Sequence, residues 1–558
     1  MQIKGFESAT SNGTVLPPEN LGGLIGRAIL KYGDAPAYIC MGARLSFRQL
    51  DDLSDCFAAW LMHVARLERG TRVAIQLPNL LQYPVVALGI LKAGMVIVNI
   101  NPLYSSREIH YQLQDSGASV LVVFANTAHS AAAIAQDTDV RHVVVTEAGD
   151  LHNFPDRQII NTGSRLLNRY KPFSFADQHA FTQILKEGRN ALLTRTIGDV
   201  VNAPDDLALL QYTGGTTGIA KGAMLTHGNL LTNIRQLEAL LDEDCPGVGA
   251  IMLGPLPLYH IYAFNLSFLT SLHRGHITLL IPNPKDMKAL LKAVKPWQIN
   301  GVVGINTLYR MLFESEEFRQ LDFSGMKISA SGGMALSPGI ARQWEELTGV
   351  RIIEGYGMTE CSPVVACNRY RDFKPGTVGK AAPGTSLCLK DEHGNEVATG
   401  EVGEICVKGP QVMQGYWQRE AENRIVFDDE GWLHTGDLGV LDDEGYLRIV
   451  DRIKDMIIIS GFNVFPNEIE EHVCRHPQII DACAIAVGDE CASQIKLFVV
   501  VSNPNLSCED IISHCRTGLA AYKVPRHVEF REALPKSEIG KVLRRRLRDE
   551  ETASISMA

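Results

Sequence analysis

The chain has 558 residues, which is too long for a small binding module and enough for about three or four domains, or for one long domain with a cap. Hydrophobic residues make up 46% and charged residues 21%, which excludes a disordered or fibrous protein and allows a large core. The net charge of −10 argues against a general nucleic-acid-binding protein, because such proteins neutralise phosphates with Lys and Arg, so no nucleic acid partner is expected.

The first twenty residues and the cysteines indicate the compartment. The N-terminal segment contains Glu7, Asn12 and a Pro17–Pro18 pair and lacks the apolar core of a signal peptide, so we expect a cytoplasmic protein. The twelve cysteines include no Cys-x-x-Cys pair and no Cys/His array with zinc spacing. We therefore interpret them as reduced and mostly structural.

An uncharged stretch of 19 residues, Val73–Leu91, is long enough to span a bilayer. Pro78, Asn79 and Pro84 interrupt it, and such residues are typical of turns and helix starts. The pattern therefore favours a strand at Val73–Leu77, a loop, and a buried helix beginning at Pro84 over a transmembrane helix.

Short β-branched and apolar runs alternate with helical stretches through most of the chain. The predicted strands are Val120–Phe124, His142–Thr146, Leu207–Tyr212, Ile277–Ile281, Ile299–Val303 and Arg351–Glu354. Continuous apolar strands of this kind predict parallel sheets covered by helices on both faces. Functional residues are then expected in loops at the carboxyl ends of these strands.

The sequence pattern changes after residue 380, where Gly- and Asp-rich turns lie between short predicted strands. This pattern predicts hairpins. The last segment has predicted helices near Pro466–Arg475 and Glu509–Leu519 and predicted strands at Ala482–Val487 and Ile495–Val501. The predicted fold class is α/β: a large N-terminal domain, residues 1–453, of wound α/β subdomains plus a β-rich subdomain, and a small hinged α+β C-terminal domain, residues 454–558.

The most informative loop follows the predicted strand Leu207–Tyr212 and reads TGGTTGIAKG over residues 213–222. Glycines let backbone N–H groups turn toward an anion, hydroxyls add donors and Lys221 adds charge, so the loop suits a polyphosphate. It is not a Walker A loop, because Ala220 and Gly222 flank the lysine, and a general P-loop ATPase is disfavoured. By itself, a Thr/Gly-rich surface turn is the alternative.

Other motifs accompany this loop along the chain. They are PLPLYH at 255–260, GYGMTE at 355–360, GWLHTGD at 431–437, VDRIKD at 450–455, SGFNVFPNE at 460–468 and PKSEIGK at 535–541. With them the sequence resembles the adenylate-forming superfamily, and within it the bacterial long-chain fatty-acid–CoA ligases, over roughly residues 25 to 550. The resemblance implies that a carboxylate attacks the α-phosphate of ATP to give acyl-AMP and pyrophosphate, and that the thiol of CoA then displaces AMP. No protein nucleophile is needed, which agrees with the lack of a recognisable Ser-His-Asp or Cys-His constellation.

The resemblance assigns the nucleotide site residue by residue. The triphosphate loop would consist of Thr213, Gly214, Gly215, Thr216, Thr217, Gly218 and Lys221. Glu360, with Thr213, would hold Mg²⁺, because a carboxylate beside ATP requires a cation between the two negative groups. The other assigned contacts are Tyr356 and Gly357 at adenine, Thr359 at the α-phosphate, and Asp437 and Arg452 at the ribose.

Lys541 is, by the same resemblance, the lysine that meets the attacking carboxylate and the α-phosphate, and with Glu360 and Thr213 it makes up the expected catalytic set. Rotation of the small domain about Lys454 would then replace Lys541 by a loop with Gly461 and Phe462 for the CoA step. A rigidly packed cap is the alternative to such a hinge.

The acyl site is expected around residues 255–264 and 331–333. His260 would border the carboxylate, although a lone histidine among apolar residues also fits core packing. Phe264, one helical turn on, falls where relatives place an aromatic gate to the fatty-acid tunnel. Gly332 and Gly333, with the helix Asn306–Leu312, would line the pocket, because missing side chains make room for an acyl tail; simple core packing stays open for each residue.

The leading hypothesis is a long-chain fatty-acid–CoA ligase that uses fatty acid, ATP and CoA, with Mg²⁺ as cofactor. A ligase for medium-chain or aromatic acids, and one that passes acyl-AMP to a carrier protein, remain alternatives. A nucleotide-binding regulatory protein without activity is disfavoured by Glu360, Asp437 and Lys541. Peripheral membrane contact and a homodimer are further expectations, the first because fatty acids concentrate at bilayers and the second from the habit of the family.

Overall fold

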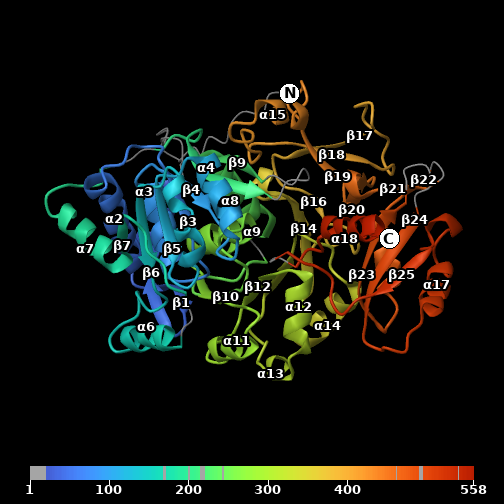
Figure 1. Cartoon of the computed structure of the whole chain (residues 1–558), viewed down its shortest axis with the longest axis horizontal. Coiled ribbons are helices and arrows are strands. Elements are labelled where there is room, and N and C mark those ends of the chain that lie inside the picture. Colours follow the sequence, from blue (N-terminus) through green and yellow to red (C-terminus); the bar gives the residue numbers. More distant parts are fainter. Residues whose placement is uncertain are drawn as a thin grey trace.

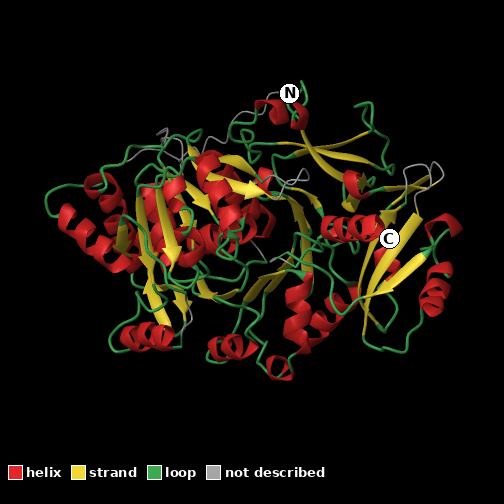
Figure 2. Cartoon of the chain, viewed as in Figure 1, coloured by secondary structure: helices red, strands yellow, loops and turns green. Residues whose placement is uncertain are grey.

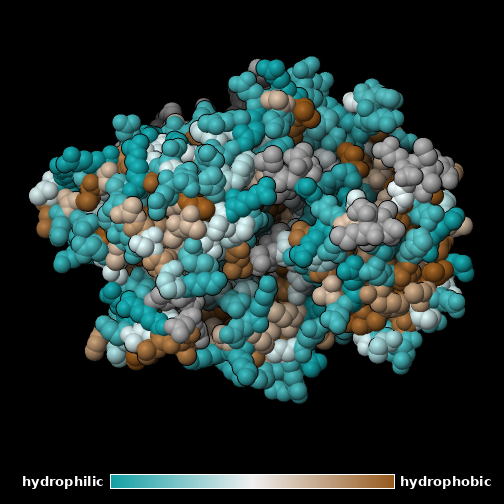
Figure 3. Space-filling model, in the orientation of Figure 1, coloured by the Kyte–Doolittle hydropathy of each residue, from teal (hydrophilic) through white to brown (hydrophobic). Residues whose placement is uncertain are grey.

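The computed structural model describes residues 21–167, 171–198, 202–213, 220–241, 244–459, 462–488, 494–537 and 540–557. In this part of the chain, five sheets and the helices packed on them form a large lobe and a smaller C-terminal unit (Figure 1). The predicted mixed α/β architecture is confirmed. The face seen in Figure 3 is largely hydrophilic, and hydrophobic side chains gather on it over the C-terminal strands.

A nine-stranded sheet in the order β16-β15-β14-β13-β12-β10-β11-β1-β2 runs through the large lobe. Its strands are β1 Pro36–Cys40, β2 Ala43–Ser46, β10 Ile251–Gly254, β11 Ile277–Leu280, β12 Gly301–Gly304, β13 Ile328–Ser331, β14 Ile352–Gly357, β15 Val364–Cys367 and β16 Lys380–Ala381. The six neighbouring strands β14, β13, β12, β10, β11 and β1 are parallel to one another. The carboxyl ends of β12, β13 and β14 therefore open on one edge, where ligand loops gather in such sheets.

A second sheet of seven strands has the order β7-β6-β5-β3-β4-β8-β9. Its strands are β3 Arg72–Gln76, β4 Val96–Asn99, β5 Val120–Phe124, β6 His142–Thr146, β7 Gln178–Ala180, β8 Leu207–Thr213 and β9 Lys221–Thr226. Only β9 runs antiparallel to its neighbour. Figure 2 shows helices on both sides of this sheet, which explains why strands such as β4 are buried along their whole length.

The helices of the large lobe cover these sheets. They are α1 Leu21–Tyr32, α2 Phe47–Ala59, α3 Gln82–Lys92, α4 Ser106–Ser116, α5 Ala128–Ala132, α6 Asp156–Leu166, α7 Phe181–Leu192, α8 His227–Leu241, α9 Ile261–Ala263, α10 Ser271–Arg274, α11 Met287–Val294, α12 Asn306–Glu314, α13 Glu316–Arg319, α14 Pro338–Thr348 and α15 Glu420–Val426. The strand, loop and buried helix expected across Val73–Leu91 are present as β3 and α3. Gly89 lets α3 approach α2, since a Cβ there would lie 2.8 Å from Phe57. Within the described ranges, no helix has the length and hydropathy needed to cross a membrane.

The predicted hairpins after residue 380 form an antiparallel sheet, β17 Ser386–Lys390, β18 Gly403–Lys408, β19 Leu433–Leu441 and β20 Leu447–Arg452. The C-terminal unit follows, with β21 Ile457–Ile459, β22 Phe462–Val464, β23 Ile479–Val487, β24 Gln494–Val501, β25 His527–Phe530 and the helices α16 Pro466–Val473, α17 Cys508–Arg516 and α18 Arg544–Met557. It has a hydrophobic core of its own, which includes Ile469, Leu497 and Ile511. The boundary at residues 453 and 454 stays a prediction.

Several polar contacts hold the C-terminal unit against the large lobe. Asn467 N at the start of α16 donates to Asp451 Oδ2 (2.8 Å) in β20, and Asn467 Nδ2 donates to the carbonyl of Val450 (3.1 Å) in the same strand. Arg310 of α12 donates to the carbonyl of Ile480. Figure 1 shows α18 close to β20 and β23. These contacts bring the loop before α18 to the edge where the carboxyl ends of the parallel strands open.

Candidate functional site

A buried carboxylate marks the junction of the nine-stranded and four-stranded sheets. Asp437 in β19 accepts a hydrogen bond on Oδ2 from Tyr356 Oη (2.7 Å) and an ion pair on Oδ1 from Arg452 Nε (2.8 Å). Tyr356 lies in β14, whereas Arg452 faces Asp437 directly across the β19–β20 ladder. Only 4% of the aspartate is exposed, so its position is fixed by the two sheets. The structure therefore brings together three residues that the sequence assigned to a nucleotide.

Lys541 lies in the electrostatic field of this cluster. Burial is the main cause that lowers the pKa of Lys541 to about 8; the positive charge of Arg452 lowers it further, and Asp437 opposes the shift. The preceding Gly540 has φ of +76°, and a Cβ there would overlap the side chain of Thr307 at the start of α12. The close approach of these two segments fixes the loop that carries Lys541, whose ammonium group feels the charges of Asp437 and Arg452.

Glu360 follows β14 in a short turn, Thr359–Cys361, and is buried. Its Oε1 accepts a hydrogen bond of 2.6 Å from Tyr416 Oη, and burial raises the pKa of the carboxyl group. The ammonium of Lys221 lies 5.3 Å from the centre of the Tyr416 ring, and Lys221 is paired with Thr213 across the β8–β9 hairpin. Glu360 and Lys221 thus both contact Tyr416, and Thr213 stands opposite Lys221. The loop residues Gly214, Gly215, Thr216, Thr217 and Gly218 lie outside the described residues.

A buried amide network fixes the turn that carries Glu360. Asn233 of α8 donates to the carbonyl of Val364 (2.9 Å) and accepts from its N–H (3.2 Å). Asn265 donates to the carbonyl of Ser362, and the Ser362 hydroxyl donates to the carbonyl of Gln411 (2.9 Å). Satisfied buried networks of this kind rigidify the backbone that they hold, so Thr359 and Glu360 are held on a rigid support.

An apolar cavity adjoins the same strand end. Tyr356, Gly357 and Thr359 form one side of its wall, and Leu237 and Leu241 of α8 form another. The remaining wall includes His260, Tyr262, Leu266, Ser331, Gly332 and Gly333. Through Tyr356, which also binds Asp437, the cavity joins an apolar compartment to the polar cluster.

Two polar groups stand in this apolar wall. Burial lowers the pKa of His260 to about 4, so the ring is neutral at pH 7. Its Nδ1 accepts from the N–H of Tyr262 (3.3 Å), which leaves the proton of the neutral ring on Nε2. The buried Ser331 hydroxyl has no hydrogen-bond partner within the described part of the chain. A ligand that enters the cavity therefore meets two donors that carry no net charge.

Phe264 lies outside the wall of this cavity, and its role as a gate stays a prediction. The Phe264 side chain is fully buried and packs against Phe268 with ring centres 5.2 Å apart. Residues 264–270 form a π-helix that begins one ordinary helical turn after His260, since the N–H of Phe264 donates to the carbonyl of His260 (2.9 Å). Tyr262 and Leu266 occupy the wall instead.

The residues expected to serve the CoA step are placed differently. Burial lowers the pKa of Lys454, Arg452 lowers it further and Asp437 opposes the shift, so Lys454 lies in the electrostatic field of the cluster. Lys454 lies in a short turn, Ile453–Asp455, between β20 and β21. Phe462 is 56% exposed and stacks on Tyr522 with ring centres 4.9 Å apart, and Gly461 lies outside the described residues. The structure thus brings Lys541, and not Phe462, to the nucleotide residues.

Tyr416, Tyr262 and the two α8 leucines were not predicted as site residues. Leu237 and Leu241 are four residues apart, the spacing of one helix face, which signals burial but not what is buried. Tyr416 lies 56 residues from Glu360 in the sequence. No local spacing connects these two residues.

Comparison with known proteins agrees with this geometry. The family model for the AMP-binding enzyme matches residues 26–417, and that for the AMP-binding enzyme C-terminal domain matches residues 468–541. A long-chain-fatty-acid–CoA ligase of Escherichia coli O6:H1 is 45% identical over 94% of this chain and 93% of its own length. One of Haemophilus influenzae is 43% identical, over 96% and 95%. The crystal structure of ATP-bound MatB from Rhodopseudomonas palustris has a TM-score of 0.79 at 28% identity and covers 95% of this chain and 99% of that chain.

Proposed function

The chain belongs to the AMP-binding enzyme family, and from this premise we propose that it is a long-chain fatty-acid–CoA ligase. It would join the fatty acid to AMP with release of pyrophosphate, and then transfer the acyl group to CoA with release of AMP. Relatives 43% to 45% identical over nearly the whole chain bear this name. The observation that carries the proposal is the apolar cavity that ends at Tyr356 and Thr359, beside the buried Asp437.

The cavity suits the two ends of a fatty acid. Its apolar walls would bury the tail, and each buried CH₂ group contributes roughly 0.8 kcal/mol. The neutral His260 ring and the unpartnered Ser331 hydroxyl are donors for the carboxylate or for the acyl carbonyl. Because neither donor is charged, they orient the carboxylate without suppressing its nucleophilicity.

The nucleotide would bind on the other side of β14. Asp437 can accept from both ribose hydroxyls while Arg452 and Tyr356 hold its carboxylate in place. Glu360 fits a divalent cation: it is a buried carboxylate with a raised pKa, and a Mg²⁺ ion held with Thr213 would offset the cost of keeping it ionised. The ion would supply positive charge to the phosphate oxygens.

Lys541 completes the site for the first half-reaction. With a pKa of about 8 it is mostly protonated at neutral pH, and its ammonium approaches from the side of Asp437 and Arg452. A fixed positive charge there reduces the repulsion between the carboxylate and the α-phosphate as the new bond forms. For the second half-reaction, we propose that the C-terminal unit turns about Lys454, withdraws Lys541 and brings Gly461 and Phe462 to the entry of CoA.

The test measures the two half-reactions separately. The purified protein is mixed with ATP, Mg²⁺ and palmitate, first without and then with CoA, and pyrophosphate, acyl-AMP and free thiol are followed. We expect palmitate-dependent release of pyrophosphate, and loss of thiol when CoA is added. Acids of graded length then give the chain-length preference, with a shorter or aromatic optimum favouring the alternative acids. Pyrophosphate without loss of thiol would indicate a carrier-protein acceptor, and no pyrophosphate with any acid would refute the proposal.

A further inference from the structure

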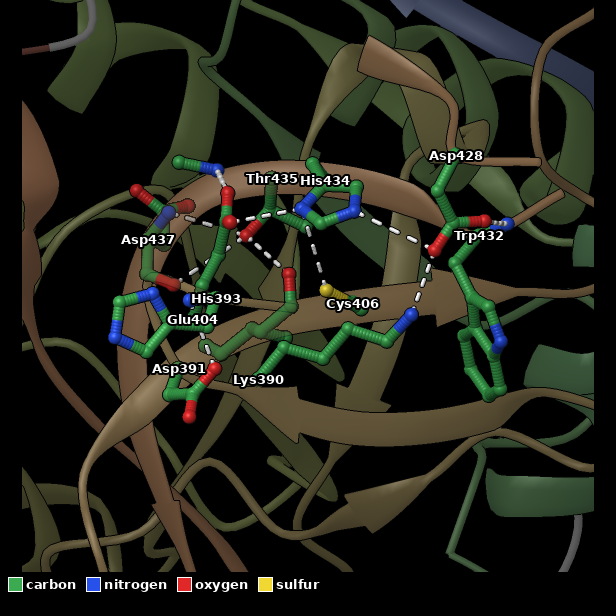
Figure 4. Close-up of polar contacts among 12 residues, drawn as sticks. Lys390, Asp391, His393, Glu404, Cys406, Asp428, Trp432, His434, Thr435 and Asp437 are labelled. Atoms are coloured by element: carbon green, nitrogen blue, oxygen red, sulfur yellow. Dashed lines mark hydrogen bonds and ion pairs between the residues drawn. The ribbon is translucent and has the colours of Figure 1, made fainter. Parts of the chain in front are cut away.

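The two central strands of the four-stranded sheet, β18 and β19, bring together three side chains with different donor atoms (Figure 4). Cys406 in β18 stands opposite His434 in β19, and its Sγ lies 3.6 Å from the Nδ1 of that histidine. Glu404, two residues before Cys406 and hence on the same face of the strand, places Oε2 2.8 Å from the same Nδ1. One sulfur, one nitrogen and one oxygen thus lie within 4.8 Å of one another.

The second ring nitrogen of His434 is also oriented by a carboxylate. Its Nε2 lies 3.5 Å from Asp428 Oδ2, and Asp428 in turn is held by Lys390 (2.6 Å) and by the N–H of Trp432 (2.9 Å). In metal sites, a ligating histidine commonly presents its other nitrogen to a carboxylate, which fixes the ring. Figure 4 shows the ring of His434 between Glu404 and Asp428. His434 has this arrangement: its Nδ1 lies beside Glu404 and Cys406, and its Nε2 faces Asp428.

A second thiol adjoins the cluster. Cys388 in β17 pairs with Cys406 across the β17–β18 ladder, and the two thiols are hydrogen-bond neighbours. Cys406 is fully buried, whereas about a fifth of the Glu404 side chain and a quarter of the His434 side chain are exposed, at 18% and 25%. An ion can therefore reach the cluster from the solvent side without opening the sheet.

We propose that Glu404, Cys406 and His434 form a binding site for a divalent cation of the zinc class. Thiolate and imidazole bind Zn²⁺ in preference to Mg²⁺, and three protein ligands leave a fourth tetrahedral position for water. The site is separate from Glu360, to which the proposed reaction assigns Mg²⁺. It does not depend on the proposed function, because metal binding is measured without any substrate.

The site is joined to the nucleotide cluster through one backbone turn. Glu404 Oε1 accepts from the N–H of Gly436 (2.9 Å), the residue before Asp437. A cation on Glu404 would therefore be bound next to the segment that positions the buried aspartate. The site has a structural character, because none of its ligands lines the cavity.

The test uses the full-length protein after chelation and dialysis, titrated with Co²⁺ and then with Zn²⁺. We expect one equivalent of Co²⁺ to give a thiolate-to-cobalt charge-transfer band that Zn²⁺ removes, and one equivalent of Zn²⁺ to raise the Tm. Cys406→Ser should abolish the band, and Cys406→Ser and Glu404→Gln should each weaken Zn²⁺ binding at least tenfold. His393→Ala, an exposed neighbour, and Cys508→Ser, an exposed cysteine, should leave the band and the affinity unchanged.

Circular dichroism of each metal-free variant separates loss of a ligand from loss of the fold, and Glu404→Gln serves if Cys406→Ser does not fold. A wild-type protein without the band, or a folded Cys406→Ser variant that keeps it, would overturn the proposal. So would Zn²⁺ binding that persists in Cys406→Ser and disappears in His179→Ala. That result would move the ion to the other group of metal-ligating side chains in the described residues, His142, Asp177 and His179.

Discussion

Lys541 is the single residue on which the proposed first half-reaction depends most. Its ammonium is the charge that approaches Asp437 and Arg452 from the C-terminal unit. Removing one preorganised electrostatic group typically lowers a rate by about 10² to 10³, so Lys541→Ala should lose at least that factor in acid-dependent pyrophosphate release. Lys536→Ala is the matched control, because Lys536 lies in the same loop but pairs with Asp481. A Lys541→Ala variant with a near-native rate would contradict the role.

The pKa of Lys541 predicts how adenylation depends on pH. Because the charged form is required, the rate should fall as pH rises through about 8. The fall is not unfolding: the pKa of this lysine is lowered from 10.5, so between about 8 and 10.5 the unfolded chain binds the proton more tightly, and this group adds to stability as pH rises. Rates and Tm values measured across this range should therefore move in opposite directions as far as Lys541 contributes.

Lys541→Arg is the control for this prediction, because a guanidinium stays charged throughout that range. The variant should be slower but should lack the alkaline decline. An unchanged decline in Lys541→Arg would assign the titration to another group.

Tyr416 connects the residues around the proposed Mg²⁺ site. Its hydroxyl donates to Glu360 and lowers the pKa of that carboxyl group, against the effect of burial. Loss of a hydrogen bond to a charged group costs about 1.5 to 3 kcal/mol, so Tyr416→Phe should slow adenylation roughly tenfold or more and shift the acidic limb of its pH profile upward. The rate measured against Mg²⁺ concentration should show a raised requirement. Tyr446→Phe, which removes a hydroxyl bound to Asp372 instead, should change neither quantity.

At the scale of elements, Leu237 and Leu241 of α8 form a part of the cavity wall that can be changed without altering the polar cluster around Asp437. Leu241→Trp would fill part of the apolar volume, so we expect the rate with long acids to fall at least tenfold relative to medium-chain acids. Overpacking costs about 1 to 3 kcal/mol of stability, and Leu240→Trp controls for it, because Leu240 is buried on the same helix but outside the wall. If both variants changed the long-to-medium ratio equally, the cavity would not be the acyl site.

The strands predicted from continuous apolar runs agree well with the structure. The end of a strand is predicted less well where the strand contains glycines. The strands at Val120–Phe124 and His142–Thr146 agree residue for residue with β5 and β6. The strand predicted at Arg351–Glu354 instead continues to Gly357 as β14, because Gly355 and Gly357 pair with β15. Glycine has low intrinsic strand preference, so the partner decides, and a partner ten residues on is not visible in the local pattern.

The same limit applies to the site. Motifs identified Asp437, Tyr356 and Arg452, which the structure brings together, but no pattern joins Tyr416 to Glu360. A π-helix cannot be distinguished from an α-helix in the sequence, so the spacing of residues 264–270 does not show which of their side chains face the cavity. Cys406 and His434 lack zinc spacing because they meet across two strands rather than along one.

At the scale of the molecule, the contact between Gly540 and α12 controls how the C-terminal unit sits on the large lobe. In Gly540→Ala the new methyl group would overlap Thr307, so Lys541 could not take its place. We expect acid-dependent pyrophosphate release to fall at least tenfold, while thiol loss from supplied acyl-AMP and CoA is retained. Thr307→Ala in the same chain should restore part of the first rate.

Gly445→Ala is the matched control for this variant. Gly445 also has a positive φ, +81° against +76° at Gly540, but its Cβ would meet no atom within 4 Å. It therefore carries the backbone strain without the collision and should leave both half-reactions near their native rates. Equal loss of the two half-reactions in Gly540→Ala would show a general defect rather than a blocked orientation.

Strand β14 contributes to both proposed binding sites, since Tyr356 forms part of the cavity wall while its hydroxyl binds Asp437. In evolutionary terms, mutations in β14 therefore change acid specificity and nucleotide binding together, although selection would otherwise act on each separately. A change in β14 that admits a new acid also disturbs nucleotide binding, whereas a change at Leu237 or Leu241 of α8 does not. Descendants of this protein that acquire other acids are therefore expected to differ first in α8, and mutant libraries made for that purpose should vary Leu237 and Leu241 and leave β14 intact.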